Sequence, residues 1–266
     1  MNWLLSATIA LYSLGLLHSI FGFCSKRRAF VRLALGMVTA GFVCHTVFLA
    51  ALGVGRGHFP IAGLSESLCF FAWCVSLAFV VANVCYRIHA LGAFSLPLVS
   101  ALTVISQVMW DEAQSIPLLL KSGWVYFHAA AAFTAYAAFF LMFVAGVLYL
   151  VQEKELRGKN FRFLYFRLPP LQVSDELMRR FLFTGFIAMS LTIISGAIRA
   201  QQAWGRFWDW EPKETASLVT WAIYFILINY RLSARWQGRR AAWISIAGLI
   251  SALVTFGANR GLHQYL

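Results

Sequence analysis

One stretch of the chain combines wide aromatic surface with charge: Trp204-Gly-Arg-Phe-Trp-Asp-Trp-Glu-Pro-Lys-Glu214. It holds three tryptophans, one phenylalanine and five charged side chains between two long apolar runs. The tryptophan ring is a large, flat apolar surface with a single polar N–H. Several such rings beside basic and acidic groups predict a platform for a flat, amphipathic ligand at a membrane surface. The alternative is an interfacial aromatic belt, which needs only scattered tryptophans and no cluster of charges.

Two histidines, His128 and His263, are expected at the same membrane level as this stretch, each at the end of its own apolar segment. Imidazole is a common axial ligand of haem iron, and a porphyrin adds a wide π face and two propionates. The pair therefore predicts axial ligation of a haem iron, unless both are ordinary interfacial histidines satisfied by water or backbone. We expect the porphyrin ring to stack on, or lie edge-on to, Trp204, Trp208 and Trp210. We expect its propionates to pair with Arg206, Lys213 or Arg260.

His45 and His58 form a candidate second haem site. His45 has apolar neighbours for several positions on either side, and an ionisable residue at membrane depth suggests function. Two interpretations stay open: a haem ligand within the bilayer, or a neutral histidine hydrogen-bonded to a neighbouring helix. His58, in Gly57-His58-Phe59-Pro60, would be a substitute ligand or a residue at the lip of the outer site.

The composition indicates a membrane protein. Apolar residues make up 61% of the chain, charged residues only 12%, and the mean hydropathy is +0.72. Ordinary soluble domains carry roughly 25% charged residues. Apolar runs long enough to span a bilayer predict an all-α, polytopic integral membrane protein with about eight transmembrane helices. The predicted spans lie near residues 3–23, 33–54, 65–86, 90–109, 124–150, 181–198, 215–231 and 241–259.

The basic residues predict the orientation. Most of the 22 Lys and Arg residues follow the first, third, fifth and seventh spans. The positive-inside rule then places both termini and the Trp-rich loop, residues 199–214, on the outer face, and a loop over 151–180 in the cytoplasm. The net charge of +12 is explained by these cytoplasmic segments beside anionic lipid, so no nucleic acid is expected as a partner. The five cysteines form no CxxC or CxxCH motif, and no covalent haem attachment is indicated.

Several motifs together resemble a known family. Residues 204–221, WGRFWDWEPKETASLVTW, are similar to the tryptophan-rich WWD signature of the CcsA/ResC-type cytochrome c assembly proteins, with Glu211 at the position of the signature aspartate. Gly57-His-Phe-Pro60 with Ser65-Glu-Ser-Leu68 resembles the family's GHFP…YESL segment. His128 matches the outer histidine ahead of the signature, and Gly261-Leu-His263 matches the one behind it.

The resemblance implies that the whole chain, 1–266, is a single haem-handling transmembrane domain in the bacterial cytoplasmic (inner) membrane. Its site would hold b-type haem between His128 and His263, over the tryptophans and Glu211, and deliver it to apocytochrome c. A CcsB/ResB-like membrane subunit is the implied partner. Whether the chain is itself an enzyme stays open; if it catalyses, it does so as a haem lyase together with that partner.

The sequence also departs from the family pattern. Asn229 stands where CcsA proteins carry a transmembrane histidine, so His45 would have to serve any haem relay inside the bilayer. The chain is short for CcsA, and its size resembles the HemX-type relatives. The alternative function is therefore a HemX-like membrane protein that senses or exports haem and regulates haem biosynthesis.

Overall fold

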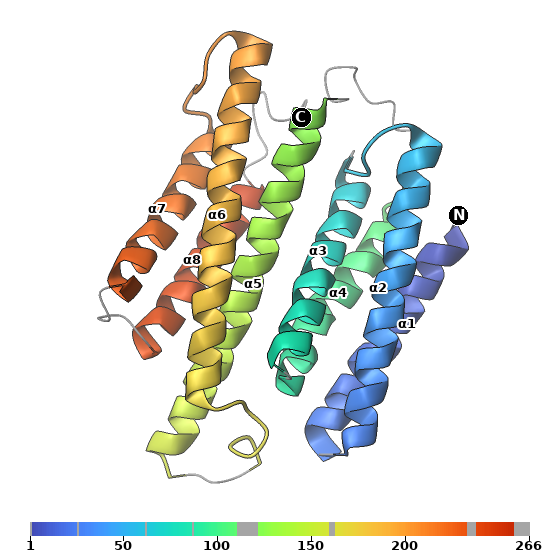
Figure 1. Cartoon of the computed structure of the whole chain (residues 1–266), viewed down its shortest axis with the longest axis vertical. Helices are drawn as coiled ribbons and strands as arrows, with labels where there is room; N and C mark the ends of the chain where they lie inside the picture. Colours follow the sequence, from blue (N-terminus) through green and yellow to red (C-terminus); the bar gives the residue numbers. More distant parts are fainter. Residues whose placement is uncertain are drawn as a thin grey trace. The chain divides into compact units, whose positions relative to one another are not determined.

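The computed structural model describes residues 2–25, 27–61, 63–86, 88–110, 122–159, 163–232 and 238–257. All regular secondary structure in these ranges is helical (Figure 1), which confirms the predicted all-α class. In chain order the helices are α1 Asn2–Ser25, α2 Arg28–Arg56, α3 Gly63–Tyr86, α4 His89–Val108, α5 Gly123–Arg157, α6 Leu171–Trp204, α7 Pro212–Leu232 and α8 Arg239–Gly257.

The helices have the length and composition of membrane spans. Within the described ranges, the seven helices α1 to α7 are long and apolar enough to cross a bilayer, while α8 is not among them. The chain is therefore a polytopic membrane protein, with one span fewer by this criterion than the eight predicted. The side of the membrane on which the termini lie stays a prediction.

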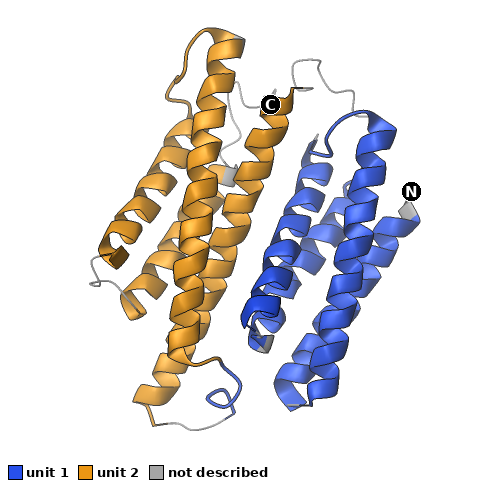
Figure 2. Ribbon diagram, viewed as in Figure 1, with its two compact units in different colours: residues 1–116, 162–168 blue, residues 117–161, 169–266 orange. Residues whose placement is uncertain are grey.

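The chain divides into two compact units (Figure 2). Unit 1 contains residues 1–116 and 162–168, and its helices form a closed ring of neighbours in the order α1, α2, α3, α4 and back to α1. Its centre is mostly apolar, with Phe48, Leu52 and Leu91 almost fully buried. Tyr12 is also fully buried there, although its hydroxyl is polar.

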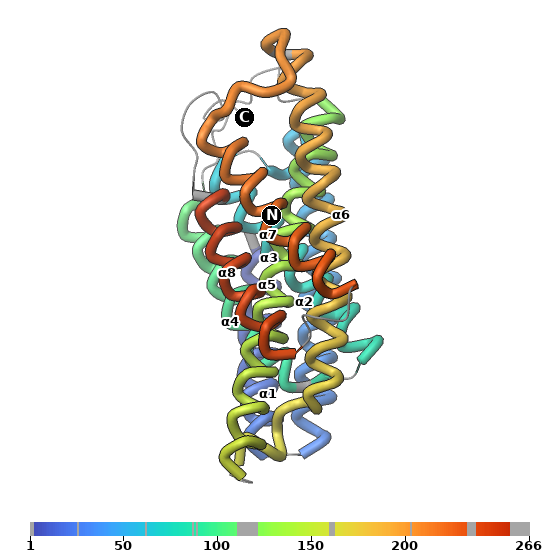
Figure 3. Tube along the Cα trace, turned by 90° about the vertical axis from the view of Figure 1, so that its left-hand side faces the viewer, coloured from blue at the N-terminus to red at the C-terminus, as the bar shows by residue number. Residues whose placement is uncertain are grey.

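Unit 2 contains residues 117–161 and 169–266, and its neighbours run in the same cyclic order, α5, α6, α7, α8 and back to α5. The long helices α5 and α6 lie side by side over much of their length (Figures 1 and 3). Phe139 of α5 stacks on Tyr224 of α7, with ring centroids 3.6 Å apart. A Cβ on Gly185 or Gly248 would lie within 2.5 Å of these rings, so glycine is what lets α6 and α8 approach the stack.

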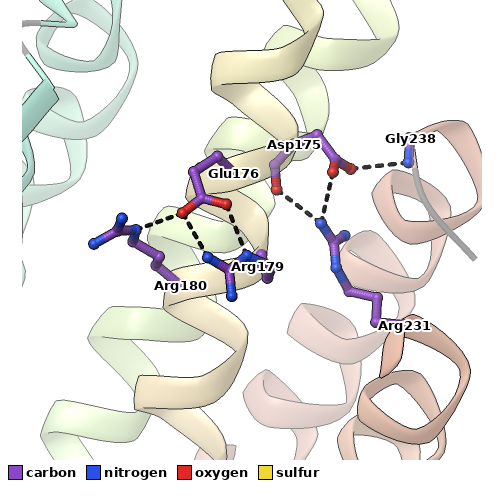
Figure 4. A network of polar contacts seen from close by, with 6 residues as sticks. All are labelled: Asp175, Glu176, Arg179, Arg180, Arg231 and Gly238. Carbon is purple, nitrogen blue, oxygen red and sulfur yellow. Dashed lines mark hydrogen bonds and ion pairs between the residues drawn. The ribbon is translucent and has the colours of Figure 1, made fainter. Parts of the chain in front are cut away.

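At the end of unit 2 where α6 begins, Asp175 joins three segments (Figure 4). Its carboxylate accepts hydrogen bonds from Arg231 of α7 and from the backbone N–H of Gly238, both at 2.8 Å. The neighbouring Glu176 binds Arg179 and Arg180 of its own helix. Because Arg231 is buried, this ion pair fixes the distance between the start of α6 and the end of α7.

The two predicted loops are shorter than expected. In the segment 151–180, α5 continues to Arg157 and α6 already begins at Leu171, directly after the Pro169-Pro170 pair. In the segment 199–214, α6 continues to Trp204 and α7 begins at Pro212, which leaves 205–211 as the loop. A span predicted from hydropathy ends at the last apolar residue. Polar and charged residues can extend the same helix beyond that point. The sides of the membrane that these segments face stay predictions.

Candidate functional site

The Trp-rich segment is a tight loop between α6 and α7. Helix α6 ends at Trp204 and is followed by Gly205, whose φ of 73° is the left-handed conformation that closes many helices. Trp210 also has a positive φ, 57°, which is uncommon for a residue with a side chain. Pro212 starts α7 at the position where a missing N–H costs nothing. The loop conformation is thus fixed at both ends.

Glu214 holds the loop against the first turn of α7. Its carboxylate accepts the backbone N–H of Asp209 at 2.9 Å and that of Glu211 at 3.3 Å. This is the acidic half of a helix capping box, in which a Glu in the first turn reaches back to the residue before the helix. Sequence reasoning missed Glu214, although a glutamate two residues after an N-terminal proline was a usable signal.

The tryptophans of the loop differ in exposure. Trp204 and Trp208 are partly buried, whereas Trp210 is 70% exposed and Phe207 60% exposed. Trp208 and Trp210 meet edge to face with centroids 6.0 Å apart. The Nε1 of Trp208 is buried and finds no acceptor among the described residues. The loop therefore presents open aromatic surface and one buried N–H donor.

The charged residues of the loop are partly engaged with one another. Arg206 forms an ion pair with Asp209 at 2.8 Å, and its side chain remains 55% exposed. Lys213 and Glu211 are partly buried. Arg206 is one of the predicted propionate partners. To bind a ligand, it would therefore have to share its guanidinium with the Asp209 carboxylate or release that carboxylate.

His128 lies in the second turn of α5, at the same end of unit 2 as the loop. Its Nδ1 donates a hydrogen bond to the backbone carbonyl of Thr192 in α6, at 2.9 Å. A carbonyl can only accept, so the proton is on Nδ1, and in the neutral ring Nε2 carries the lone pair. Metal-bound histidines usually have this arrangement, in which one ring nitrogen is fixed by a backbone carbonyl or carboxylate.

The α6 surface around His128 was not assigned from the sequence. Gly196 lies against the imidazole, where a Cβ would be 2.9 Å from Cε1. Arg199 follows three residues later on the same face of α6, one turn nearer the loop, and is 8% exposed. A buried arginine within an apolar helix is itself a functional signal, and the sequence could have given it.

His45, the candidate ligand inside the bilayer, lies at the centre of unit 1 with no exposed surface. Its Nδ1 is 3.3 Å from the hydroxyl of Tyr12, and its Nε2 is 3.2 Å from the sulfur of Cys69. Tyr12 in turn donates to Ser76. Both ring nitrogens thus have partners on α1 and α3, which is the second of the two interpretations, a histidine bonded to neighbouring helices. A role in haem passage stays a prediction.

His58 lies in the turn after α2 and is 8% exposed. Its Nδ1 donates to the carbonyl of Phe59 at 2.9 Å. Beside it, Arg56 forms an ion pair with the buried Glu66, and its guanidinium lies 5.1 Å from the centre of the Trp110 ring. The turn is therefore anchored by charge and by an aromatic contact. His58 and the unit 2 residues belong to different units, and its part in a haem site stays a prediction.

His263, the second predicted axial ligand, and Arg260 lie outside the described residues. Helix α8 ends at Gly257. The connection between α7 and α8 is short, so α8 runs back toward the end of unit 2 at which α7 begins. In the part of the chain that the structure describes, no three His, Cys, Asp or Glu side chains gather into a metal site. Haem ligation by His128 and His263 stays a prediction.

The fold and the site define a class: a polytopic helical membrane protein with a charged, tryptophan-rich loop beside a histidine of fixed tautomer. The family model of the cytochrome c assembly proteins matches residues 61–263. The chain belongs to this family. The matched range includes His128, the Trp-rich loop and His263, as the sequence resemblance implied.

Individual relatives agree with this assignment. The chain is 34% identical to the cytochrome c biogenesis protein CcsA of Synechococcus sp. (strain CC9902), over 79% of its own length and 78% of the relative's. It is 31% identical to CcsA of Guillardia theta, over 83% and 81% of the two chains. It is 28% identical to CcsA of Gloeobacter violaceus, over 88% and 86%.

A solved structure resembles the fold. The cytochrome c haem lyase CcmF aligns with a TM-score of 0.70 at 16% identity, over 96% of this chain and 46% of that one. At this identity the likeness concerns the fold alone.

Proposed function

We propose that the chain binds haem at the Trp-rich end of unit 2 and presents it for covalent attachment to apocytochrome c. The observation that carries the proposal is the Nδ1–Thr192 hydrogen bond of His128, which gives Nε2 the lone pair that an iron ligand needs. Membership in the cytochrome c assembly family supports the same conclusion. Haem is the cargo in this proposal, in the non-covalent b form, and His263 supplies the second axial ligand.

The distances along α6 are compatible with a porphyrin. Gly196, which touches the His128 ring, precedes Trp204 by eight residues, or roughly 12 Å along a helix. That separation is comparable with the width of a porphyrin. Because the iron lies at the centre of the ring, about half of that width and a propionate would extend from His128 toward the loop, where Trp210 offers an exposed face.

The propionates need positive or N–H donors near the rim of the ring. Arg199 provides a buried guanidinium one turn from Gly196, and Trp208 provides a buried Nε1–H. A charge-assisted hydrogen bond in such a partly dry setting is stronger than one in water. Arg199 and Trp208 are therefore assigned to the propionates together with Lys213, ahead of the exposed Arg206.

Attachment to apocytochrome c requires positioning more than acid–base catalysis. The thiol S–H of a CxxCH motif adds across a vinyl group: a C–S bond forms, and the thiol proton ends on the other vinyl carbon. This addition has no net redox change, and the reactivity belongs to the porphyrin. The chain would act as a lyase component by orienting haem beside a CcsB-like subunit that brings the apocytochrome, at the outer face of the bacterial cytoplasmic membrane.

The test is the absorption spectrum of the purified chain carrying His128→Ala. Loss of an axial ligand should lower haem affinity at least as much as loss of a ligand's supporting bond, about 10- to 100-fold. Added imidazole should restore much of the low-spin spectrum, because it replaces the missing ligand. The control is His18→Ala, which removes a histidine whose Nδ1 binds the Leu14 carbonyl of its own helix.

Equal haem content in both variants would refute the proposal. Full haem binding by the unaltered chain, combined with cytochrome c maturation that does not depend on this chain, would instead favour the HemX-like alternative, in which haem is sensed or exported rather than attached.

A further inference from the structure

A cavity of about 610 Å³ opens in unit 1, at the end where α1 finishes and α2 begins. Its walls come from α1, α2, α4 and the segment 163–168, which the chain reaches after α5. The residues that matter for its chemistry are Arg28, Arg32, Arg167, Phe23, Phe166 and Ala90. None of them takes part in the haem site proposed above.

The cavity is strongly basic. Arg28 and Arg32 lie one turn apart on α2, and neither has a carboxylate partner among the described residues. Arg167 donates to the carbonyl of Cys24 with one nitrogen, while its other terminal nitrogen is buried without a partner in the described ranges. The carboxylate of Glu66, the one acidic group in the described part of unit 1, binds Arg56 at the opposite end of α2. Three guanidinium groups thus line one cavity, with no carboxylate partner for them among the described residues.

Two helix starts add to the positive potential. Arg28 is the first residue of α2, and Ala90 is the second residue of α4. Neither helix has a side-chain cap or an acidic residue in its first turn. Unsatisfied N–H groups and the helix dipole favour an anion at such a position, and a phosphate suits both the N–H groups and the arginines.

The surroundings select an anion with an apolar body. Three phenylalanines near these arginines in the sequence have exposed side chains: Phe21 is 55% exposed, Phe163 50% and Phe166 59%. These residues lie near the end of α1 and the start of α2, and the ends of helices of spanning length are expected at the level of lipid headgroups. The positive-inside prediction places this end in the cytoplasmic leaflet, where anionic lipid concentrates.

We propose that this cavity binds the phosphate headgroup of an anionic phospholipid, with its acyl chains against the exposed aromatic residues of α1 and of segment 163–168. Bound lipid would tie the segment after α5 to α1 and α2, because Arg167 and Arg28 would share one phosphate. The lipid would bind independently of haem, since the two sites share no residue.

The test uses the full-length chain in detergent, titrated with phosphatidylglycerol or phosphatidylcholine of matched acyl chains and followed by native mass spectrometry. The wild-type chain should prefer phosphatidylglycerol. The triple variant Arg28→Gln, Arg32→Gln and Arg167→Gln should bind that lipid on the order of 100-fold more weakly, because each arginine is expected to contribute about fivefold to the affinity. The matched control combines Arg27→Gln, Lys154→Gln and Arg240→Gln, which removes three exposed charges outside the cavity, and should change affinity no more than a few-fold.

Arg32→Glu gives a second variant at an exposed position, where folding is not at risk. It should weaken phosphatidylglycerol by about tenfold or more and leave phosphatidylcholine unchanged. If the cavity triple variant and the control triple variant lose the same affinity for phosphatidylglycerol, the effect is one of general surface charge and the proposal is overturned. Inorganic phosphate binding as tightly as the lipid, or protoporphyrin displacing it competitively, would also overturn it, since the cavity would then serve a free anion or a porphyrin dicarboxylate.

Discussion

Unit 1 and unit 2 share one cyclic order of four neighbouring helices, and they place their histidines differently. In unit 1, His45 is fully buried at the centre and contacts Tyr12 and Cys69 through its two ring nitrogens. In unit 2, His128 lies near one end, partly buried, with Nδ1 on a backbone carbonyl. Two histidines in apolar spans can thus differ in depth and partners: the contacts of His45 fit a packing role, whereas a ligand role for His128 stays a proposal.

The units also differ in where they keep their ion pairs. Unit 2 has a buried ion pair, Asp175 with Arg231, at the end opposite the Trp-rich loop, whereas the Arg206–Asp209 pair in that loop is more exposed. Breaking this buried pair should have the largest effect on stability, larger than the loss of His45 or of any loop contact. Asp175→Ala leaves the Arg231 guanidinium, only 3% exposed, without its carboxylate, and should cost about 3–5 kcal/mol. Thermal unfolding in detergent, with hydrogen exchange on α6 to α8, measures it.

The control for Asp175→Ala is its neighbour, Glu176→Ala. The arginines that bind Glu176 are 49% and 60% exposed, so this loss should be at most about 1 kcal/mol. If the two variants unfold alike, the buried pair does not hold α6 to α7 as the structure indicates.

The second prediction tests the central network of unit 1. His45→Ala leaves the Cys69 thiol without the imidazole and opens a cavity, at a cost of about 2–3 kcal/mol. The haem spectrum should persist, because both ring nitrogens serve helix packing. The measurement is the unfolding temperature beside the haem content per chain. Loss of haem at unchanged stability would instead support a relay through His45.

Much of the fold could be predicted from the sequence, because apolar runs of spanning length leave few alternatives to helices. The helix ends could not. Ion pairs such as Glu153 with Arg157 stabilise α5 beyond its apolar run, and a hydropathy pattern does not detect such pairs.

For the candidate site, the sequence singled out the Trp-rich loop and His128, because tryptophans, charges and a histidine are unusual at the end of an apolar span; their binding of haem stays a prediction. It could not identify Thr192 or Gly196, which are ordinary residues in an apolar helix. They matter only because α6 packs against α5 at that height. The partners of His45 were hidden for the same reason, since Tyr12 and Cys69 are distant from it in the chain.

The third prediction uses two glycines, one in each unit. In Gly196→Ala the new methyl would lie 2.9 Å from Cε1 of His128, so the imidazole must turn and strain its bond to Thr192. Haem affinity should fall about tenfold, as for loss of a ligand's supporting hydrogen bond. Stability should change by no more than about 1 kcal/mol, since better helix propensity offsets crowding. Haem titration followed by absorbance measures the first effect.

Gly36→Ala in α2 is the matched control. A Cβ there meets nothing within 4 Å, so the same chemical change should leave haem affinity intact and stabilise the chain by up to about 1 kcal/mol. Equal haem affinities in the two variants would show that the ring of His128 tolerates displacement, and that its fixed orientation is not needed.

The smallest expected effect concerns the loop itself. Glu214→Ala removes the acceptor for the N–H groups of Asp209 and Glu211, and should loosen the loop by about 1 kcal/mol. Glu214→Gln keeps a carbonyl oxygen at that position and should retain part of the protection, while Arg206→Ala breaks an exposed pair worth about 0–0.5 kcal/mol. Hydrogen exchange of residues 205–215 should rank the variants in that order. If Glu214→Ala exchanges like Arg206→Ala, the tryptophans are held by ring contacts rather than by the cap, and the edge-to-face pair of Trp208 and Trp210 becomes the element to change next.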